Sequence, residues 1–270
     1  MQMLKLNDGN KIPALGLGIW QVPADQTAKV VAGAIGLGYG LLDGAAIYGN
    51  EAGLGDGVRA SGVARDQVFV TTKVWNDCQG YDSTLNAFDE SVARLGLTPD
   101  LLLIHWPCPE KGLHLDTWRA MIRLRDDGRV RSIGVSNFMP DHLERLIGET
   151  GVTPVLNQIE LHPELPQAEL RALHDRLGIV TQSWTPLGKG RCFESAPVKA
   201  IAARTGASAA QVILRWHVQL GCSVIPRSTR PEGQAENLDV FGFALTEDEM
   251  AAMASLDTGT RLGPDPAVFS

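Results

Sequence analysis

The sequence predicts an α/β fold, a closed (β/α)8 barrel (TIM barrel), on three observations. Short apolar runs typical of strands buried in a parallel sheet alternate with amphipathic segments of helical length, and the unit recurs about every thirty residues. Eight such units fit into 270 residues, the usual size of this barrel. The rival fold, a doubly wound open sheet, needs Gly-x-Gly-x-x-Gly after the first strand, and this chain lacks it there.

The elements follow from the amino terminus onward. Residues 4–13 alternate apolar and polar side chains around a turn signal, which predicts a β-hairpin that closes the bottom of the barrel away from the chemistry. The predicted strands are 14–19, 41–42, 68–72, 101–104, 131–135, 155–159, 179–184 and 222–225. The predicted helices lie near 25–37, 50–60, 82–96, 140–149, 166–177, 208–220, 231–238 and 246–255. The short tail, 257–270, is rich in Gly and Pro, so we expect a small lid that leaves the pocket open.

Composition indicates a soluble enzyme with a single domain over residues 1–270. A hydrophobic fraction of 44% supports a large core, and no apolar run approaches the roughly eighteen residues of a membrane span. The start of the chain has no apolar segment typical of a signal peptide. The four cysteines are scattered without a Cys-x-x-Cys pair, which favours reduced thiols in the cytoplasm. The net charge of −7 disfavours nucleic acid and anionic membranes as partners.

Four polar residues stand where short apolar runs end. They are Asp43, Tyr48, Lys73 and His105. Because active sites of this barrel lie at the carboxyl ends of the strands, we expect all four side chains to point into one pocket. Taken alone, Asp43 could equally be a turn cap, Lys73 a surface charge and His105 a buried imidazole without a catalytic role. Their joint placement favours one reaction centre.

The chemistry of this set suits the reduction of a carbonyl. A phenol with a pKa of about 10 is a poor acid at neutral pH, and an adjacent ammonium lowers that pKa by stabilising the phenolate. A carboxylate keeps the ammonium charged and oriented, and a neutral imidazole can hydrogen-bond a carbonyl oxygen. The carbonyl oxygen can then be protonated while hydride reaches its carbon. A metal-dependent hydrolase would need His-x-His or carboxylate clusters at strand ends, which the sequence lacks, so no metal site is predicted.

Three tryptophans predict an apolar, aromatic mouth for the pocket. Trp20 follows the first strand, Trp75 follows Lys73, and Trp106 follows His105. These tryptophans and His105 form the expected substrate-binding set, typical of a small-molecule site.

Four further residues have a structural or an open interpretation. Trp118 and Trp216 lie in helical patterns and are expected to be packing residues. Cys108 either lines the pocket or is a small buried thiol. Arg261 in the tail either anchors a substrate carboxylate or is solvated, and the sequence leaves both interpretations open.

Six separated segments resemble signatures of the aldo-keto reductase family. They are 6–18, 43–51, 72–75, 103–107, 133–138 and 157–163. Segments 131–138, 214–221 and 237–246 are most similar to the bacterial 2,5-diketo-D-gluconic acid reductases. The resemblance implies a monomeric enzyme that uses NADPH to reduce aldehydes and ketones, including α-keto aldehydes and diketo sugar acids such as 2,5-diketo-gluconate.

The resemblance also implies a role for each residue of the reaction centre. Tyr48 would be the general acid, and Lys73 and Asp43 would tune it. His105 would orient the carbonyl. These roles agree with those inferred above from the chemistry of the side chains.

Residues that would bind the cofactor carry over in the same way. Ser136, Asn137 and Gln158 match positions that hydrogen-bond the carboxamide, and Trp184 matches the residue that stacks on the nicotinamide. The Gly-rich loop at 185–190 lets the backbone approach a pyrophosphate and adds the charge of its lysine, although alone it is equally readable as a flexible connection. The full predicted set is Gly18, Ile19, Asp43, Ser136, Asn137, Gln158, Trp184, Leu187, Gly188, Lys189, Arg227, Ser228, Thr229, Arg230, Glu236 and Asn237.

The sequence departs from the family pattern at three positions. The segment 227–230 resembles the clamp for the adenosine 2′-phosphate, with guanidinium groups and hydroxyls that fit a dianion. Arg227 stands where the family commonly has Lys, and Gly233 where it has an Arg that contacts the adenine and the phosphate. NADPH is therefore the expected cofactor, with some use of NADH. Gly44 replaces the usual Thr, which predicts looser packing around the neighbouring Asp43.

A second class of function remains an alternative. Proteins of this fold also serve as cofactor-binding redox sensors or regulatory subunits with little turnover. The intact set of four polar residues and the lack of an N-terminal extension favour the enzyme.

Overall fold

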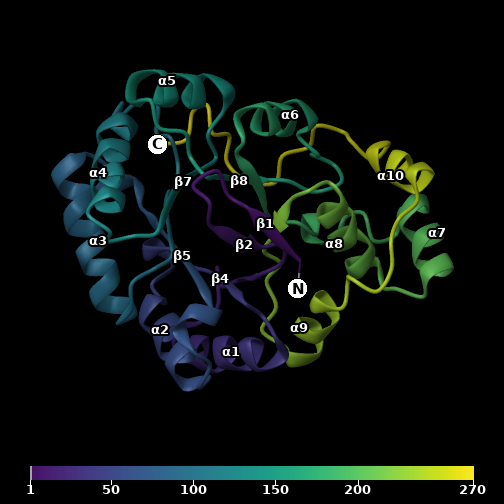
Figure 1. Cartoon of the computed structure of the whole chain (residues 1–270). Helices are drawn as coiled ribbons and strands as arrows, with labels where there is room; N and C mark the ends of the chain where they lie inside the picture. The colour runs from purple at the N-terminus through teal and green to yellow at the C-terminus, as the bar shows by residue number, and fades with distance from the viewer. Residues whose placement is uncertain (1) are drawn as a thin grey trace.

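The computed structural model, which describes residues 2–270, confirms the predicted parallel barrel (Figure 1). Consecutive strands pair in parallel from β3 to β10. They are β3 (Leu17–Gly18), β4 (Leu41–Asp43), β5 (Phe69–Val74), β6 (Leu101–Ile104), β7 (Ser132–Ser136), β8 (Leu156–Glu160), β9 (Val180–Trp184) and β10 (Ser223–Val224). A parallel bridge between Leu15 and Val224 and a hydrogen bond from Gly16 N to Val224 O join the first strand to the last. The predicted first strand, 14–19, is a regular strand only over Leu17–Gly18.

Helices surround this barrel (Figure 1). They are α1 (Ala24–Leu37), α2 (Glu51–Ala60), α3 (Tyr81–Leu95), α4 (His114–Asp126), α5 (Pro140–Thr150), α6 (Ala168–Leu177), α7 (Ala196–Thr205), α8 (Ala209–Gln219), α9 (Pro231–Leu238) and α10 (Glu247–Ala254). The predictions for α8 and α10 began one residue early because Ser208 and Thr246 are the N-caps, whose side chains accept from backbone N–H groups of the first turn. Within residues 2–270, every helix is too short or too polar to span a lipid bilayer.

Two helices were missing from the predicted ranges, although Trp118 of the first one was assigned to a helical pattern. The helix α4 buries a stripe at three-residue spacing, Leu115, Trp118 and Met121, which was a usable signal. The helix α7 lies between β9 and α8 and is an addition to the repeating unit, so the count of units did not require it. The predicted packing roles of Trp118 and Trp216 are confirmed, since both side chains are buried.

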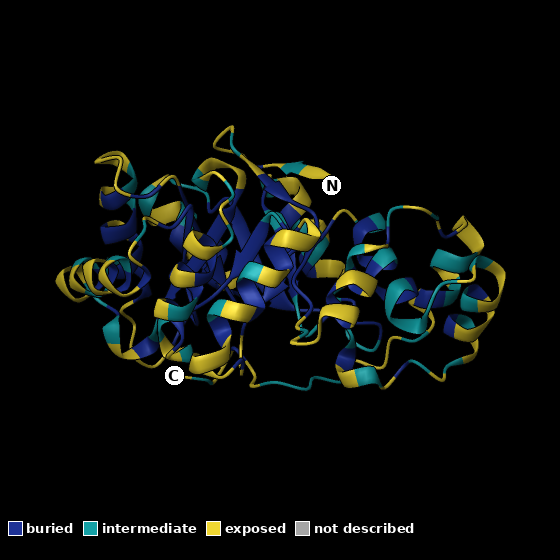
Figure 2. Cartoon of the chain, turned by 90° about the horizontal axis from the view of Figure 1, so that it is seen from below, coloured by how far each residue is buried: buried dark blue, intermediate teal, exposed yellow. Residues whose placement is uncertain are grey.

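The N-terminal hairpin covers the bottom of the barrel, as predicted. Strands β1 (Met3–Lys5) and β2 (Lys11–Pro13) pair in antiparallel register. Leu6 and Ile12 are buried in one cluster with residues of the barrel strands, and Asn10 Nδ2 donates to Ser132 Oγ at the start of β7. The two ends of the chain lie at opposite ends of the barrel (Figure 2). The tail therefore belongs to the end where the parallel strands finish.

Candidate active site

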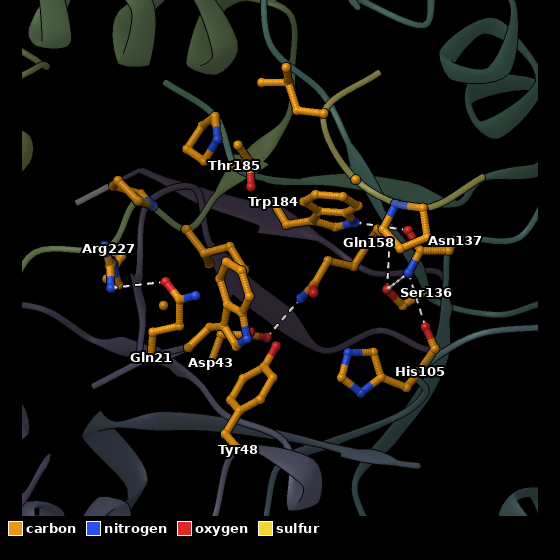
Figure 3. Close-up of a pocket in the computed structure, with 18 of the residues that line it drawn as sticks. Gln21, Asp43, Tyr48, His105, Ser136, Asn137, Gln158, Trp184, Thr185 and Arg227 are labelled. Atoms are coloured by element: carbon orange, nitrogen blue, oxygen red, sulfur yellow. Dashed lines mark hydrogen bonds between the residues drawn. The ribbon is translucent and has the colours of Figure 1, made fainter. Parts of the chain in front are cut away.

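A cavity of about 820 Å³ opens at the carboxyl ends of the strands, a size typical of small-molecule sites (Figure 3). Most of the predicted site residues line it. These are Gly18, Trp20, Asp43, Tyr48, Trp75, His105, Trp106, Ser136, Asn137, Gln158, Trp184, Leu187, Lys189 and Arg227. These residues come from many separate strand–helix units, and they line one pocket, as their positions at strand ends predicted.

Lys73 lies beneath the pocket and connects its neighbours. Its side chain is fully buried, and Nζ donates to Asp43 Oδ1 at 2.6 Å and to the carbonyl oxygen of Gly44 at 2.8 Å. Nζ also lies 3.4 Å from the Oη of Tyr48. Tyr48 itself belongs to the short 3-10 helix η1 (Ala46–Tyr48), which follows β4. The structure therefore brings the ammonium, the carboxylate and the phenol into one hydrogen-bonded group.

Burial changes the proton affinities in this group. Burial alone lowers the pKa of Lys73, but the charge of the Asp43 carboxylate raises it, and the net result is a raised pKa, so the amine stays charged. For Tyr48, burial raises the pKa and the charge of Lys73 lowers it, and the net direction is upward. The expected lowering of the phenol pKa is therefore wrong in its net direction, because the pocket desolvates the phenolate.

His105 has the neutral imidazole that the chemistry needs. Burial, and then the charge of Lys73, hold the pKa of His105 well below its ordinary value. Its ring lies 5.8 Å from the Tyr48 ring, centroid to centroid, and packs edge-on against Trp75. A neutral imidazole beside the phenol can donate an N–H to a carbonyl oxygen without adding a second cation.

Asn137 connects the predicted carboxamide-binding residues to the reaction centre. Its Nδ2 donates to the carbonyl oxygen of His105 at 3.0 Å, and its Oδ1 accepts from Trp184 Nε1 at 2.8 Å (Figure 3). Asn137 has a positive φ of 65°, a conformation that Asn tolerates better than most residues. One side chain therefore fixes both the strand end that carries His105 and the indole on the pocket wall.

Gln158 supports the carboxylate from the other side. Its Nε2 donates to Asp43 Oδ2 and to Gln182 Oε1, both at 2.7 Å. Sequence analysis missed Gln182, the only amide in β9, where it stands between Thr181 and Ser183. The carboxylate of Asp43 therefore has a hydrogen-bond donor on each oxygen, one from Lys73 and one from Gln158.

Of the basic side chains predicted to bind the cofactor phosphates, two line the pocket and one does not. Lys189 and Arg227 line the cavity, and Arg227 Nη1 donates to Gln21 Oε1 at 3.3 Å. Figure 3 shows Arg227 and Gln21 across Tyr48 from His105. The remaining predicted cofactor residues lie outside the cavity lining: Ile19, Gly188, Ser228, Thr229, Arg230, Glu236 and Asn237. A Cβ at Gly233 would lie 2.6 Å from the Oγ of Ser228.

The space beside Gly44 is filled, contrary to the expectation of looser packing. A Cβ built on Gly44 would lie 2.9 Å from Cδ2 of Leu54 and 3.5 Å from Cδ1 of Ile19. Leu54 is fully buried in the core. The leucine from α2 therefore occupies the volume that a larger residue after Asp43 would need.

The substrate side of the cavity is more aromatic and more closed than the sequence indicated. Trp20 is half exposed at the rim, whereas Trp106 is nearly buried and its ring lies 4.6 Å from that of Phe269. Sequence analysis missed these lining residues: Gln21, Ile47, Phe193, Leu262, Gly263, Pro264 and Phe269. Four of them belong to the tail, which forms a wall of the cavity and is more than the small lid expected.

The structure also decides between the alternative interpretations of Arg261 and Cys108. Arg261 neither lines the cavity nor is free in solvent, because its side chain is 22% exposed and Nη1 lies 3.5 Å from the buried carboxylate of Glu160. Cys108 does not line the cavity and is completely buried, and burial raises the pKa of its thiol to about 11. It is a buried structural thiol. All four cysteines are free.

Comparison with known proteins agrees with this geometry. The profile described as "Aldo/keto reductase family" matches residues 14–258. The chain belongs to the aldo/keto reductase family. An aldo-keto reductase of Mycobacterium sp. (strain KMS) is 54% identical over 99% of this chain and 98% of its own length. The methylglyoxal reductase DkgA of Yersinia pestis is 44% identical over 99% of this chain and 97% of its own.

A solved structure of this aldo/keto reductase family extends the comparison. The crystal structure of a Gox0644 mutant in complex with NADPH has a TM-score of 0.96 and 47% identity, covering 100% of this chain and 98% of that one. The predicted barrel and the predicted enzyme class are thereby confirmed. This chain is an oxidoreductase of the family and acts on carbonyl compounds.

Proposed function

We propose that this aldo/keto reductase catalyses the NADPH-dependent reduction of aldehydes and ketones to alcohols, with Tyr48 as the general acid. The substrates proposed include α-keto aldehydes and diketo sugar acids such as 2,5-diketo-gluconate. The observation that carries the proposal is the buried Lys73 ammonium, placed between the Asp43 carboxylate and the Tyr48 phenol under one cavity. The name of the methylglyoxal reductase relative supports the α-keto aldehydes.

The cavity fits a dinucleotide cofactor with several phosphates. Lys189 and Arg227 both line it, and within residues 2–270 neither has a carboxylate at ion-pair distance, so their charges are available to anionic groups. The indole of Trp184 and the amides of Asn137 and Gln158 would hold the nicotinamide. Lys189 would hold the pyrophosphate, and Arg227 with residues 228–230 and 236–237 the adenosine 2′-phosphate. When bound, NADPH supplies the hydride that reduces the carbonyl carbon.

The protein's own part is to hold the carbonyl and to move one proton. The imidazole N–H of His105 orients the carbonyl oxygen towards the Oη of Tyr48. Because burial raises its pKa, the phenol stays protonated at neutral pH and can donate to that oxygen. Lys73 then stabilises the phenolate that remains, and Asp43 keeps Lys73 charged and in place.

The test is the change Tyr48→Phe, which keeps the ring and removes the proton donor. We measure the loss of NADPH absorbance with methylglyoxal, an aromatic aldehyde and a diketo sugar acid, and cofactor affinity by fluorescence. Turnover should fall on the order of 10²–10⁴-fold while affinity for NADPH stays unchanged. Substantial turnover in the variant would exclude Tyr48 as the acid.

The same measurements distinguish the sensor alternative. Wild-type protein that binds NADPH and quenches its fluorescence, yet oxidises none of it with any carbonyl, would favour a cofactor-binding sensor. Parallel assays with NADH give the cofactor preference. We expect NADPH to be preferred by a modest ratio, because Gly233 has no side chain to contact the adenosine phosphate.

A further inference from the structure

Glu160 is a buried carboxylate that the proposed reaction does not use. It is the last residue of β8, and its side chain has no exposed surface. A buried carboxylate is costly unless donors surround it. Its Oε1 accepts from Leu262 N at 2.6 Å and lies 3.1 Å from His162 Nε2. Its Oε2 accepts from Gly263 N at 3.2 Å and from Arg261 Nη1 at 3.5 Å.

Three of these four donors belong to the C-terminal tail. On either side of them, the chain makes few other polar contacts with the barrel. Before them, the N–H groups of Thr258 and Thr260 donate to the carbonyl oxygen of Glu164. After them, the hydrogen bonds that residues 264–270 make lie within the segment, all to Asp265. Glu160 is therefore the last polar attachment before the segment that carries Phe269.

The attached segment forms the apolar wall of the substrate side. Gly263 packs so closely on Trp184 that a Cβ would lie 2.4 Å from the indole ring atom Cη2. Leu262, Pro264 and Phe269 line the cavity, and Phe269 packs on Trp106. The same attachment pairs Arg261 with Glu160 and keeps that cation out of the cavity lining.

We infer that Glu160 is a positioning residue that sets the substrate range by fastening the tail as the apolar wall of the cavity. The inference rests on the proposed reductase activity for its substrate readout. With the tail fastened, carbonyl compounds that carry aromatic or bulky apolar groups gain contacts with Trp106, Phe269 and the adjoining tail residues. A small α-keto aldehyde such as methylglyoxal reaches Tyr48 and His105 without needing that wall.

The test compares two changes that act on the same attachment from opposite sides. Glu160→Gln weakens the acceptor. Gly263→Ala keeps the Glu160 side chain but adds a Cβ that would lie 2.4 Å from Trp184 Cη2 and 3.3 Å from Glu160 Oε2, so the tail has to move away from both. In both variants the KM for an aromatic aldehyde should rise on the order of tenfold, the size expected for losing one apolar contact, with kcat nearly unchanged. The KM for methylglyoxal and the dissociation constant of NADPH should stay within about twofold of wild type.

Glu164→Gln is the matched control. This neighbouring acid pairs with Arg191 through its side chain and meets the tail only through its backbone carbonyl oxygen, so its substitution should change neither KM. Release of the tail is measured separately by limited proteolysis with mass detection. The protease should cleave the chain beyond residue 261 faster in Glu160→Gln and in Gly263→Ala than in wild type, and no faster in Glu164→Gln.

The outcomes separate this inference from the proposed function. If wild type oxidises no NADPH with any carbonyl, the proposed function fails, and proteolysis still reports whether Glu160 fastens the tail. The inference is overturned if the tail is cut no faster in either variant. It is also overturned if the Gly263→Ala variant, shown to be folded by circular dichroism, has a KM that rises equally for the aromatic aldehyde and for methylglyoxal.

Discussion

Replacing Lys73 with Met should cost stability as well as activity, because it leaves the Asp43 carboxylate buried without its counter-ion. Both side chains are at most 3% exposed, and Nζ lies 2.6 Å from Oδ1. Removing one partner of such a pair costs about 3–5 kcal/mol. Because the hydrogen bond from Gln158 to the other oxygen remains, we expect the lower end, about 3 kcal/mol, which is roughly 6–12 °C in melting temperature.

The assay is urea unfolding followed by tryptophan fluorescence, combined with a double variant. Lys73→Met with Asp43→Asn removes both charges, so it should recover at least half of the lost free energy of unfolding while activity stays low. Arg145→Met is the control, since Arg145 pairs with Glu149 at the surface and should contribute less than about 1 kcal/mol. The reasoning is refuted if the double variant is no more stable than Lys73→Met alone.

Three further predictions concern a packed glycine, two buried histidines and the glycine at the predicted phosphate clamp. Gly44→Thr should lower the free energy of unfolding, measured in urea, by about 1–3 kcal/mol, because the added Cβ meets Leu54. Adding Leu54→Ala should recover part of that loss. If the two substitutions lower the free energy additively, the contact does not explain the loss. Burial lowers the pKa of His174 to about 4 and of His217 to about 3. Below a pH of about 6.5 the unfolded chain therefore binds more protons than the folded chain, and each histidine should cost about 1.4 kcal/mol per pH unit as the pH falls towards its folded pKa. Equal stability at pH 7 and pH 5 would exclude this. Gly233→Arg should tighten the binding of NADPH but not of NADH in fluorescence titrations, and equal changes would argue against a contact with the phosphate.

The placement of the candidate reaction centre could be predicted because it depends on local rules. An apolar run indicates a strand, the barrel places every strand end at one face, and a polar residue at that end faces the pocket. Asp43, Lys73 and His105 each follow from this reasoning, and the structure brings them together with Tyr48 as expected. Glu160 departs from this rule, because it ends β8 but its carboxylate faces the tail and does not line the cavity.

The wall of the cavity could not be predicted because it depends on contacts between distant segments. Arg261 and Glu160 are 101 residues apart, and the tail has no regular structure whose period could indicate which side faces the barrel. The substitution at Gly44 shows the same limit. A missing side chain suggests empty space until the position of Leu54 on another element is known.

The pKa of Tyr48 shows most clearly why even the direction of a pKa shift is hard to infer from sequence. The lysine lowers the pKa and burial raises it, and only the structure reveals that the phenol is buried enough for desolvation to dominate. A raised pKa suits a proton donor, because the phenol must still hold its proton when the carbonyl arrives. In the proposed reaction Lys73 would act when the proton leaves, by stabilising the phenolate from its position 3.4 Å from the Oη of Tyr48. That stabilisation is the same interaction that lowers the pKa, so the ammonium would set both the acidity of Tyr48 and the energy of the state that follows proton transfer.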